Sequence, residues 1–282
     1  MKREALGGKL DQLHRLFADM ESVLVAFSGG IDSTLVLKVA QDTLGDRALA
    51  VTAVSPTFPE IELEWTTRLV AEIGACHRIV RTDQLQVPAF VQNDASRCFH
   101  CKTDLYQLLG GLQQELKMRA VVDGTNLDDL GDERPGHAAA REWGVRSPLV
   151  EAGLSKMEVR ELARELKLSN WDKPAAACLS SRIQRGTTIT VEKLSRVERA
   201  EAFLLGQGFR QVRVRDSDGA ARVEVESTEV SRLLEPALGA SIIHYLQQLG
   251  FASVALDPAG YRRGGGNGGN VNSKPLSVIR KT

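Results

Sequence analysis

Short apolar stretches alternate with longer amphipathic stretches along the first 180 residues. Apolar residues at helical spacing over residues 6–20 predict an amphipathic first helix. The apolar stretches between helices have the length of strands, and an α/β fold follows, with a parallel sheet covered by helices. The predicted strands are Val23–Phe27, Ala48–Val54, His77–Val80 and Ala120–Val122. The predicted helices between and after them are Ser33–Leu44, Pro59–Ile73, Lys102–Lys117 and one from Ser155 to about Leu168.

The pattern changes after residue 190, where strands and helices no longer alternate regularly. The expected order is a long helix, a hairpin, a second helix and a strand: 190–205, Gln211–Arg215 with Ala221–Val225, Ile242–Leu249 and Ala252–Leu256. This order indicates a small C-terminal α+β domain. We therefore expect domains over 1–186 and 187–263, followed by a Gly/Asn-rich tail over 264–282 that is too rich in glycine to pack alone and should be flexible.

One motif lies between the first predicted strand and the helix after it: Ser28-Gly29-Gly30-Ile31-Asp32-Ser33. A strand that enters a glycine turn and then a helix directs several N–H groups at one spot, where the helix dipole adds positive potential. Gly29 and Gly30 let an anion approach without meeting a Cβ, and Ser28 and Ser33 add hydroxyl donors. We therefore predict a phosphate-binding turn, the alternative being a glycine-rich turn that only packs closely.

The same turn differs from a Walker A loop because it holds an acid and no lysine. Asp32 beside bound phosphate indicates Mg²⁺, which neutralises both groups. The motif resembles the PP-loop of the ATP pyrophosphatases, a superfamily that includes GMP and NAD synthetases and tRNA-thiolating enzymes. The resemblance implies an adenine nucleotide α-hydrolase-like fold and the use of ATP with Mg²⁺. It also implies cleavage between the α- and β-phosphates, with pyrophosphate held in the turn.

A second polar motif follows the fourth predicted strand: Asp123-Gly124-Thr125-Asn126-Leu127-Asp128-Asp129. Sites in α/β proteins gather at the carboxyl ends of strands, so we place Gly124 and Thr125 in the ATP site. Asp128 or Asp129 is predicted to hold Mg²⁺ together with Asp32. The alternative is that these residues are ordinary turn and cap residues.

The sequence contains four cysteines, three of which could act as metal ligands. Cys98 and Cys101 form a Cys-x-x-Cys pair, and Cys178 lies in a separate segment. Three thiolates suit a zinc ion with one more ligand or a [4Fe–4S] cluster with one open iron, and spacing alone leaves these and the absence of a metal equally open. Cys76 is predicted to be a small buried residue beside the third strand.

Composition and charge limit the partners. Lys+Arg and Asp+Glu both number 36, so the formal net charge is zero and no global excess of positive charge is available for a nucleic acid. No apolar stretch approaches the ~20 residues of a membrane span, and the N-terminus carries no recognisable secretory signal. We expect a cytoplasmic protein with no membrane or nucleic-acid partner and with reduced thiols.

Taken together, the motifs resemble the LarE family of ATP-dependent sulfur transferases, which build the nickel-pincer cofactor of lactate racemase. The matching segments span nearly the whole chain: residues 28–33, 98–102, 123–126 with 128–129, 134–136, 147–149, 171–174 with 177–179, 181–182 and 260–262. The resemblance implies a pyridinium-3,5-biscarboxylic acid mononucleotide as substrate. ATP would adenylate one of its carboxylates, and sulfur would then displace AMP. A homo-oligomer and a downstream nickel-inserting protein are the implied partners.

The resemblance also implies roles for individual residues. Asp32, Lys102 and Cys178 would be catalytic. In one branch of the family the equivalent of Cys178 gives up its own sulfur. In the other branch three cysteines, which resemble Cys98, Cys101 and Cys178, are proposed to bind a [4Fe–4S] cluster. Because all three are present here, we favour the cluster.

Substrate binding is assigned to the C-terminal part of the chain. Arg213 and Arg215 alternate along one predicted strand, so they project to one face, where two guanidinium groups can hold a phosphate. The resemblance implies that Ser181, Arg182 and Glu201 complete the substrate site. Two other functions stay open: a tRNA-thiolating PP-loop enzyme, and a nucleotide-binding iron–sulfur carrier that releases no pyrophosphate.

Overall fold

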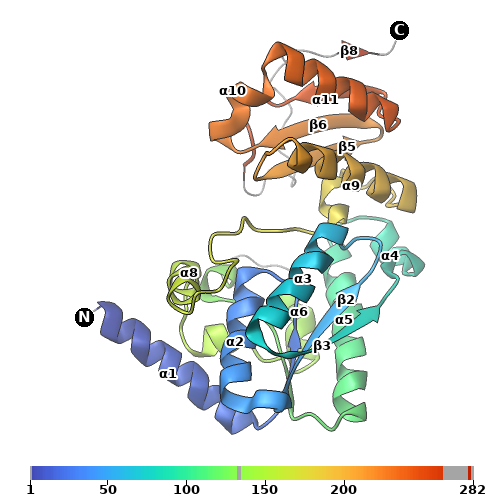
Figure 1. Cartoon of the computed structure of the whole chain (residues 1–282). Helices are drawn as coiled ribbons and strands as arrows, with labels where there is room; N and C mark the ends of the chain where they lie inside the picture. Colours follow the sequence, from blue (N-terminus) through green and yellow to red (C-terminus); the bar gives the residue numbers. More distant parts are fainter. Residues whose placement is uncertain (1, 132–134, 263–278, 281–282) are drawn as a thin grey trace. The chain divides into compact units, whose positions relative to one another are not determined.

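The computed structural model describes residues 2–131, 135–262 and 279–280, and it contains two compact units (Figure 1). The first unit is Met1–Gln84 with Ser96–Ala176, and the second unit is Leu85–Ala95 with Ala177–Thr282. The second unit thus takes an eleven-residue segment from the middle of the first. Its main part begins at Ala177, whereas the sequence suggested 187, and the functional division into domains stays a prediction.

The first unit is built on a four-stranded parallel sheet with strand order β3-β2-β1-β4. The strands are β1 (Val23–Ala26), β2 (Ala48–Val54), β3 (Cys76–Arg81) and β4 (Ala120–Val122). The helices are α1 (Lys2–Met20), α2 (Ile31–Leu44), α3 (Glu60–Ile73), α5 (Arg97–Glu115), α6 (Pro135–Glu142), α7 (Pro148–Glu151) and α8 (Lys156–Glu165). The prediction of a parallel α/β sheet is confirmed.

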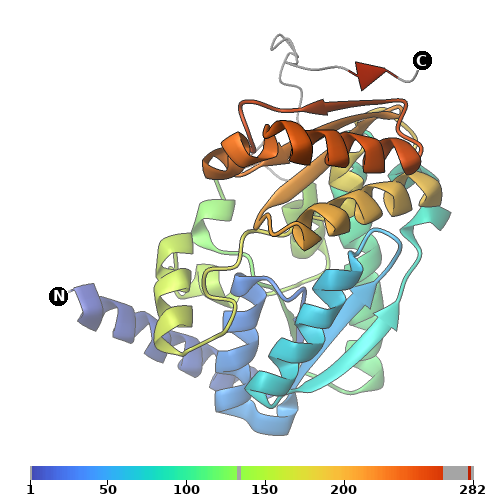
Figure 2. The same cartoon turned by 45° about the horizontal axis from the view of Figure 1, so that its top comes forward.

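Helices cover both faces of this sheet (Figures 1 and 2). Val23 and Val25 of β1 pack in one apolar core with residues of α1, α2 and α8. Leu24, between them, packs in a second core with residues of α5 and α6. Successive strand side chains point to opposite faces, so a strand buried on both faces is an unbroken apolar run. This burial explains why β1 and β2 could be located from hydrophobicity alone.

Strand β3 lies at the edge of the sheet and is the most exposed strand of the first unit. Among the described residues it pairs only with β2, and four of its six residues are exposed. Cys76, its first residue, is a free and exposed thiol. The prediction that Cys76 is buried is therefore wrong, because an edge strand is covered along one side only.

The second unit contains a mixed sheet of order β5-β6-β7-β8. Its strands are β5 (Val212–Ser217), β6 (Ala220–Val225), β7 (Ser253–Leu256) and β8 (Ile279–Arg280). Its helices are α4 (Pro88–Val91), α9 (Val191–Gly206), α10 (Val230–Leu233) and α11 (Pro236–Gln248). The predicted hairpin is confirmed as the antiparallel pair β5–β6, and its two turn residues, Asp218 and Gly219, have φ of 52° and 90°.

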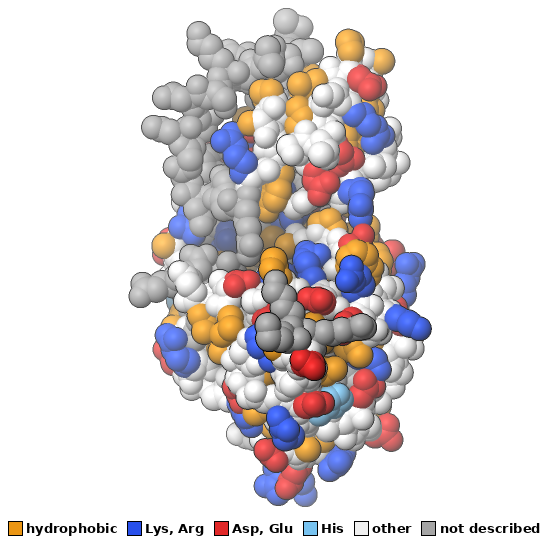
Figure 3. Space-filling model, turned by 90° about the vertical axis from the view of Figure 1, so that its left-hand side faces the viewer, with side chains coloured by type: hydrophobic (Ala, Val, Ile, Leu, Met, Phe, Trp, Pro, Cys, Tyr) orange, Lys and Arg blue, Asp and Glu red, His pale blue; other side chains and the backbone are white. Residues whose placement is uncertain are grey.

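The expected tail begins in residues that lie outside the described part of the chain, namely 263–278. Within the tail, Ile279–Arg280 form β8 and pair antiparallel with β7. No helix among the described residues is both long and apolar enough to cross a membrane. On the face shown in Figure 3, positive and negative side chains of the described residues are interspersed.

Candidate active site

The turn between β1 and α2 is held by its own hydroxyl groups. Gly29 has φ of +71°, a conformation that favours glycine. The Ser33 hydroxyl donates to the Gly30 carbonyl at 3.0 Å, and the Ser28 hydroxyl oxygen lies 3.3 Å from the Ser33 hydroxyl oxygen. The N-cap residue of α2, Gly30, provides no side-chain cap, and the first N–H groups of a helix have no acceptor within the helix. This turn is therefore suited to bind an anion.

Gly124 closes one side of the turn. It follows β4, which pairs with β1, so both strands end at the same edge of the sheet. A Cβ at Gly124 would lie 2.7 Å from the Ser33 nitrogen and 3.0 Å from the carbonyl carbon of Asp32. Only a residue without a side chain fits there. The two motifs found in the sequence thus meet in the structure.

Asp32 is bound through both of its carboxylate oxygens. Oδ1 accepts a hydrogen bond from Asn126 Nδ2 at 3.1 Å, and Oδ2 forms an ion pair with Lys156 Nζ. Asn126 comes from the second motif and Lys156 from the first residue of α8. The carboxylate that we expected to contact Mg²⁺ therefore has a cationic side chain as a partner.

Asp128 and Asp129 take part in local caps. Asp129 Oδ2 accepts from the Asn126 N–H at 3.2 Å, and Asp128 Oδ2 accepts from the Lys156 N–H at 2.8 Å. Across the described part of the chain, no three His, Cys, Asp or Glu side chains group together to hold a metal ion. The role of Asp128 and Asp129 as Mg²⁺ ligands stays a prediction.

Asn170 stabilises the turn through hydrogen bonds from its side chain. Its side chain is buried, and Nδ2 donates to the Gly29 carbonyl at 3.2 Å and to the Thr34 hydroxyl oxygen at 2.9 Å. Thr34 in turn donates to the Gly30 carbonyl at 2.8 Å. These bonds give the carbonyls of both glycines donors within the protein and so help to fix the backbone of the turn.

Lys102 belongs to a buried chain of polar groups that starts on α5. Lys102 Nζ donates to the Tyr106 hydroxyl oxygen at 3.2 Å, and that hydroxyl donates to Asp123 Oδ2 at 3.0 Å. Tyr106 is 1% exposed and Asp123 is 4% exposed. Burial, opposed by the charge of Lys102, raises the pKa of Tyr106 to about 12. Burial lowers the pKa of Lys102, but its charge interactions and hydrogen bond with Tyr106 and its attraction to Asp123 outweigh this effect, and the net shift is upward.

Asp123 also organises the second motif. It accepts from the Thr125 N–H at 3.1 Å, from the Thr125 hydroxyl at 2.9 Å and from the Ser147 hydroxyl at 2.8 Å. Both donors of Thr125 thus point at Asp123, and the predicted contact of Thr125 with ATP stays a prediction. The chain Lys102–Tyr106–Asp123 physically links α5 to the segment that approaches the anion-binding turn.

None of the four cysteines forms a disulfide, and the role of Cys98, Cys101 and Cys178 in sulfur chemistry stays a prediction. Cys98 and Cys101 lie at the start of α5, one helical turn apart, with Cys98 exposed and Cys101 half-buried. Cys178 lies in the second unit, where its Sγ is 3.0 Å from the Ser180 hydroxyl oxygen. Each of the three thiols retains access to solvent.

Arg182 and Glu201 form a buried ion pair in the second unit. Arg182 Nε and Nη2 donate to the two oxygens of Glu201 at 2.8 and 2.9 Å. Arg182 Nη1 donates to the Cys178 carbonyl at 3.1 Å and to the Ser181 hydroxyl oxygen at 3.0 Å. Burial lowers the pKa of Arg182, but Glu201 outweighs this effect and raises it overall. The structure thus brings four predicted site residues together.

Arg213 and Arg215 lie next to this pair with different partners. Arg213 is 8% exposed, and its guanidinium lies 5.2 Å from the centre of the Tyr261 ring. Burial and then the positive charge of Arg182 lower the pKa of Arg213. Arg215 donates to Glu224 Oε2 from two nitrogens at 3.1 Å. Arg213 therefore lies close to the like charge of Arg182, and Arg215 is paired with Glu224.

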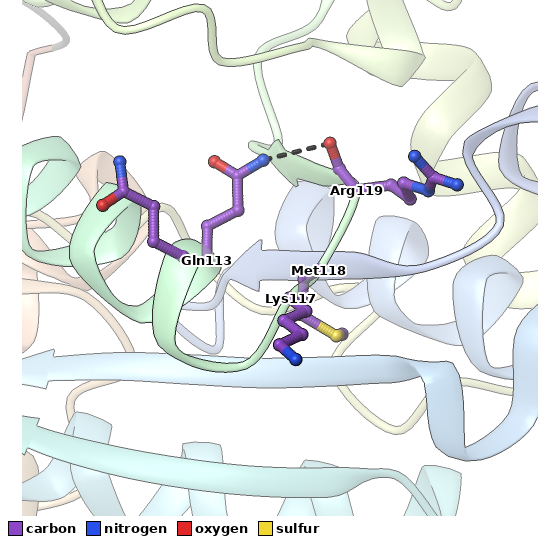
Figure 4. Close-up of a pocket in the computed structure, with 5 residues that line it drawn as sticks. Gln113, Lys117, Met118 and Arg119 are labelled. Atoms are coloured by element: carbon purple, nitrogen blue, oxygen red, sulfur yellow. Dashed lines mark hydrogen bonds between the residues drawn. The ribbon is translucent and has the colours of Figure 1, made fainter.

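A hollow in the first unit lies before β4 in the chain, at the other end of that strand from Gly124. It is lined by Gln113, Gln114, Lys117, Met118 and Arg119, and Figure 4 shows Gln113 Nε2 donating to the Arg119 carbonyl at 3.0 Å. The residues that line this hollow come before β4 in the chain, whereas Gly124 comes after β4. The hollow is therefore at the opposite end of the strand from the predicted chemistry.

Three contributors to the site were missed in the sequence: Lys156, Asn170 and Tyr106. Lys156 carries a recognisable signal, because a lysine in the first turn of a capped helix opposes the helix dipole and suggests a partner elsewhere. Tyr106 lies one turn after Lys102, a spacing that brings two side chains of a helix together. Asn170 carries no comparable local signal.

The fold and the turn define this chain as an α/β protein of the PP-loop class. It is 40% identical, over 247 residues, to pyridinium-3,5-bisthiocarboxylic acid mononucleotide synthase of Lactiplantibacillus plantarum, a match that covers 87% of this chain and 89% of that protein. The chain belongs to the family of this synthase, the LarE family.

Two further similarities place the chain more broadly. An uncharacterised protein of Synechocystis is 44% identical over 259 residues, 92% of this chain and 97% of its own. The glutamine-hydrolysing GMP synthase of Saccharolobus solfataricus is 26% identical over 162 residues of one of its chains, 52% of this chain and 44% of that one. No protein-family model matches the sequence.

Proposed function

We propose that this protein uses ATP to replace a carboxylate oxygen of a pyridinium mononucleotide with sulfur. The observation that carries the proposal is the anion-binding turn at residues 28–33, in a chain 40% identical to a synthase named for a bisthiocarboxylic mononucleotide. The Asp32 carboxylate and the close approach of Gly124 restrict the ligand to one that fits against backbone N–H groups. A polyphosphate fits this place provided that a cation such as Mg²⁺ offsets the charge of Asp32.

The reaction follows from the chemistry of carboxylates. A carboxylate is a poor electrophile because its oxygen is a poor leaving group. One carboxylate oxygen attacks the α-phosphorus of ATP, the bond to the bridging oxygen of the β-phosphate breaks, and pyrophosphate leaves. A sulfur nucleophile then attacks the acyl carbon, and AMP leaves with the original carboxylate oxygen. The protein supplies position and electrostatic stabilisation for both steps.

The ATP-binding residues come from the two motifs of the first unit. Ser28, Gly29, Gly30 and Ser33 form the turn that would bind the β- and γ-phosphates. Gly124 and Thr125 would border the nucleotide. Asp32 would contact Mg²⁺, an ion usually bound through one or two carboxylates plus substrate phosphates.

The sulfur chemistry is assigned to the cysteines. Cys98 and Cys101 are free thiols one turn apart on α5, a spacing that suits two ligands of one cluster. With Cys178 as the third ligand they would hold a [4Fe–4S] cluster, which supplies an open iron able to carry a sulfide. Lys102 lies directly after this pair and is held by Tyr106, so its ammonium group would orient an anionic group nearby.

Substrate binding is assigned to the cationic cluster of the second unit. Arg182 and Arg213 both interact with the buried charge of Glu201, and the positive charge of Arg182 contributes to the lowered pKa of Arg213. A phosphate or carboxylate of the mononucleotide would relieve this repulsion. Ser181 and Arg215 complete this predicted site.

Two measurements on anaerobically purified protein test the proposal. The first mixes the protein with ATP, Mg²⁺ and the dicarboxylate mononucleotide and quantifies AMP, pyrophosphate and product mass. We expect equal amounts of AMP and pyrophosphate, and a product heavier by the difference between sulfur and oxygen. ATP binding without pyrophosphate release would instead indicate a carrier, and activity confined to a tRNA, with a steep dependence on salt, would indicate a tRNA-thiolating enzyme.

The second measurement distinguishes the two sulfur sources. A reconstituted cluster gives a brown protein with absorption near ~400 nm and unchanged cysteine mass after turnover. A colourless protein that loses about 34 Da at Cys178, the mass of H₂S, would contradict the cluster and assign the sulfur to Cys178 itself. Replacement of Cys98 with Ser should abolish the absorption in the first case and leave turnover intact in the second.

A further inference from the structure

The charges around the anion-binding turn do not suit a polyphosphate as long as Asp32 acts alone. A carboxylate at this place repels phosphate, and the turn itself contributes only backbone dipoles and hydroxyl groups. In the structure the charge of Asp32 is balanced by the ammonium group of Lys156, with side chains 22% and 24% exposed. Both charges therefore lie where solvent and a soluble ligand can reach them.

The position of Lys156 is not explained by the stability of its own helix. It is the first residue of α8, after the N-cap Ser155, and a cation there opposes the helix dipole. Its main chain is also fixed, because its N–H donates to Asp128 Oδ2 at 2.8 Å. A capped helix end thus holds the lysine against the PP-loop acid.

Resting on the function proposed above, we propose that Lys156 is a phosphate-binding residue for ATP. Its ammonium group would leave Asp32 when the nucleotide enters and pair with the β- or γ-phosphate. Asp32 would then be available to the Mg²⁺ that accompanies ATP. Lys156 would supply from α8 the cation that a Walker A loop carries within the loop itself.

The exchange follows from the bonds that Asp32 makes. Asn126 holds Oδ1 at 3.1 Å and so keeps the carboxylate oriented when Lys156 leaves Oδ2. A lysine is suited to this exchange because it is a compact charge on a flexible stem with rotatable donors. Only ligands that contain the β-phosphate would draw Lys156 away, since AMP lacks the group that it binds.

The test compares ligands with and without the terminal phosphates. Calorimetry would measure the binding of pyrophosphate, of AMP and of an ATP analogue with a methylene bridge between the α- and β-phosphates. For Lys156→Met we expect at least a tenfold loss of affinity for the analogue and for pyrophosphate, about 1.4 kcal/mol. AMP affinity should change less than twofold. Lys156→Arg, which keeps the charge, should recover most of the loss.

Lys38→Met is the matched control. Lys38 lies on α2, as Asp32 does, but it pairs with Asp42 at 2.6 Å, so its replacement removes one charge without touching the turn. Its ligand affinities should equal those of the wild type. If Lys156 contacts phosphate, the double variant Asp32→Asn with Lys156→Met should still bind pyrophosphate weakly. If Lys156 only neutralises Asp32, the double variant should recover the wild-type affinity for pyrophosphate.

Chemical labelling of the wild-type protein gives a test that needs no folded variant. Acetylation of Lys156, followed by mass spectrometry, should be slowed by pyrophosphate and not by AMP, with Lys38 as the internal reference. Equal protection by both ligands, or affinities of Lys156→Met equal to those of the wild type, would overturn this inference alone. A wild-type protein that binds neither pyrophosphate nor the ATP analogue would overturn the proposed function as well.

Discussion

Gly124→Ala is the sharpest test of the candidate ATP site. The backbone conformation at Gly124 is not one that demands glycine, so the substitution changes only the space available. The new methyl group would lie 2.7 Å from the Ser33 nitrogen, where ordinary contacts begin at 3.4 Å. The atoms that it meets belong to the backbone of the turn, so they cannot move aside as a flexible side chain would.

The expected cost follows from this overlap. Overpacking by one methyl group costs roughly 1–3 kcal/mol when neighbours must shift. In a chain of this size that loss lowers the Tm by about 2–4 °C per kcal/mol. The displaced backbone is the one that would bind phosphate, so the Kd for ATP should rise about tenfold or more while the Kd for the mononucleotide substrate is unchanged.

The assay combines thermal unfolding with ATP titration of three proteins. Gly111→Ala is the matched control, because Gly111 lies within α5 and a Cβ there would meet nothing within 4 Å. That substitution should be neutral or should stabilise by up to about 1 kcal/mol, as alanine favours helix. If Gly124→Ala matches Gly111→Ala in both Tm and ATP affinity, the packing of the second motif against the turn plays no part in nucleotide binding.

Three further predictions concern single charges. Asp32→Asn should abolish pyrophosphate release and leave the far-UV circular dichroism unchanged, because the acid acts on the ligand and not on the core. Glu158→Gln should destabilise the protein at pH 7. Burial raises the pKa of Glu158, but hydrogen bonds from Lys9 and from the helix cap outweigh this effect and lower the pKa overall. The stability difference is therefore present above pH 4.5 and is lost as the pH falls through the depressed pKa. Arg182→Met should cost about 3–5 kcal/mol in urea unfolding, because it leaves Glu201 buried without its cation.

Each of these has a result that contradicts its reasoning. Pyrophosphate release by Asp32→Asn at the wild-type rate would remove the carboxylate from the reaction. A stability difference for Glu158→Gln that persists unchanged down to about pH 2, well below the ordinary carboxyl pKa, would show that the charge is not its source. An Arg182→Met variant as stable as the wild type would indicate that the ion pair contributes less than its burial suggests.

The local parts of the site could be predicted from sequence, and the long-range parts could not. The turn at residues 28–33 is a local sequence of strand, glycines and helix start, so its chemistry is readable directly. Gly124 was predictable because parallel strands end at one edge of the sheet. Lys156 and Asn170 reach the turn from segments more than 120 residues away, and only tertiary packing brings them there.

Cys76 and Arg215 also show that the surroundings of a side chain could not be predicted from the local sequence. The strand that contains Cys76 was located correctly, but its place at the sheet edge depends on strand order, which hydrophobicity does not encode. Arg215 was correctly placed on a strand, yet its carboxylate partner is set by the pairing of β5 with β6. The sequence indicates which side chains are reactive or charged, whereas register and strand order decide which of them are exposed and which are paired with another side chain.

The interleaved chain path has a practical consequence for anyone who wants to produce the first unit on its own. Asn93 donates to the carbonyls of Gln184 and Thr187, and Ile189 donates to the carbonyl of Val91, so residues 85–95 depend on a segment almost a hundred positions later. A fragment that ends at Ala176 would contain residues 85–95 without the later segment that bonds to them. The ring of Phe90, which is 1% exposed in the full chain, would then face water. A stand-alone fragment needs two edits: a stop after residue 176 and a short polar bridge from Gln84 to Ser96.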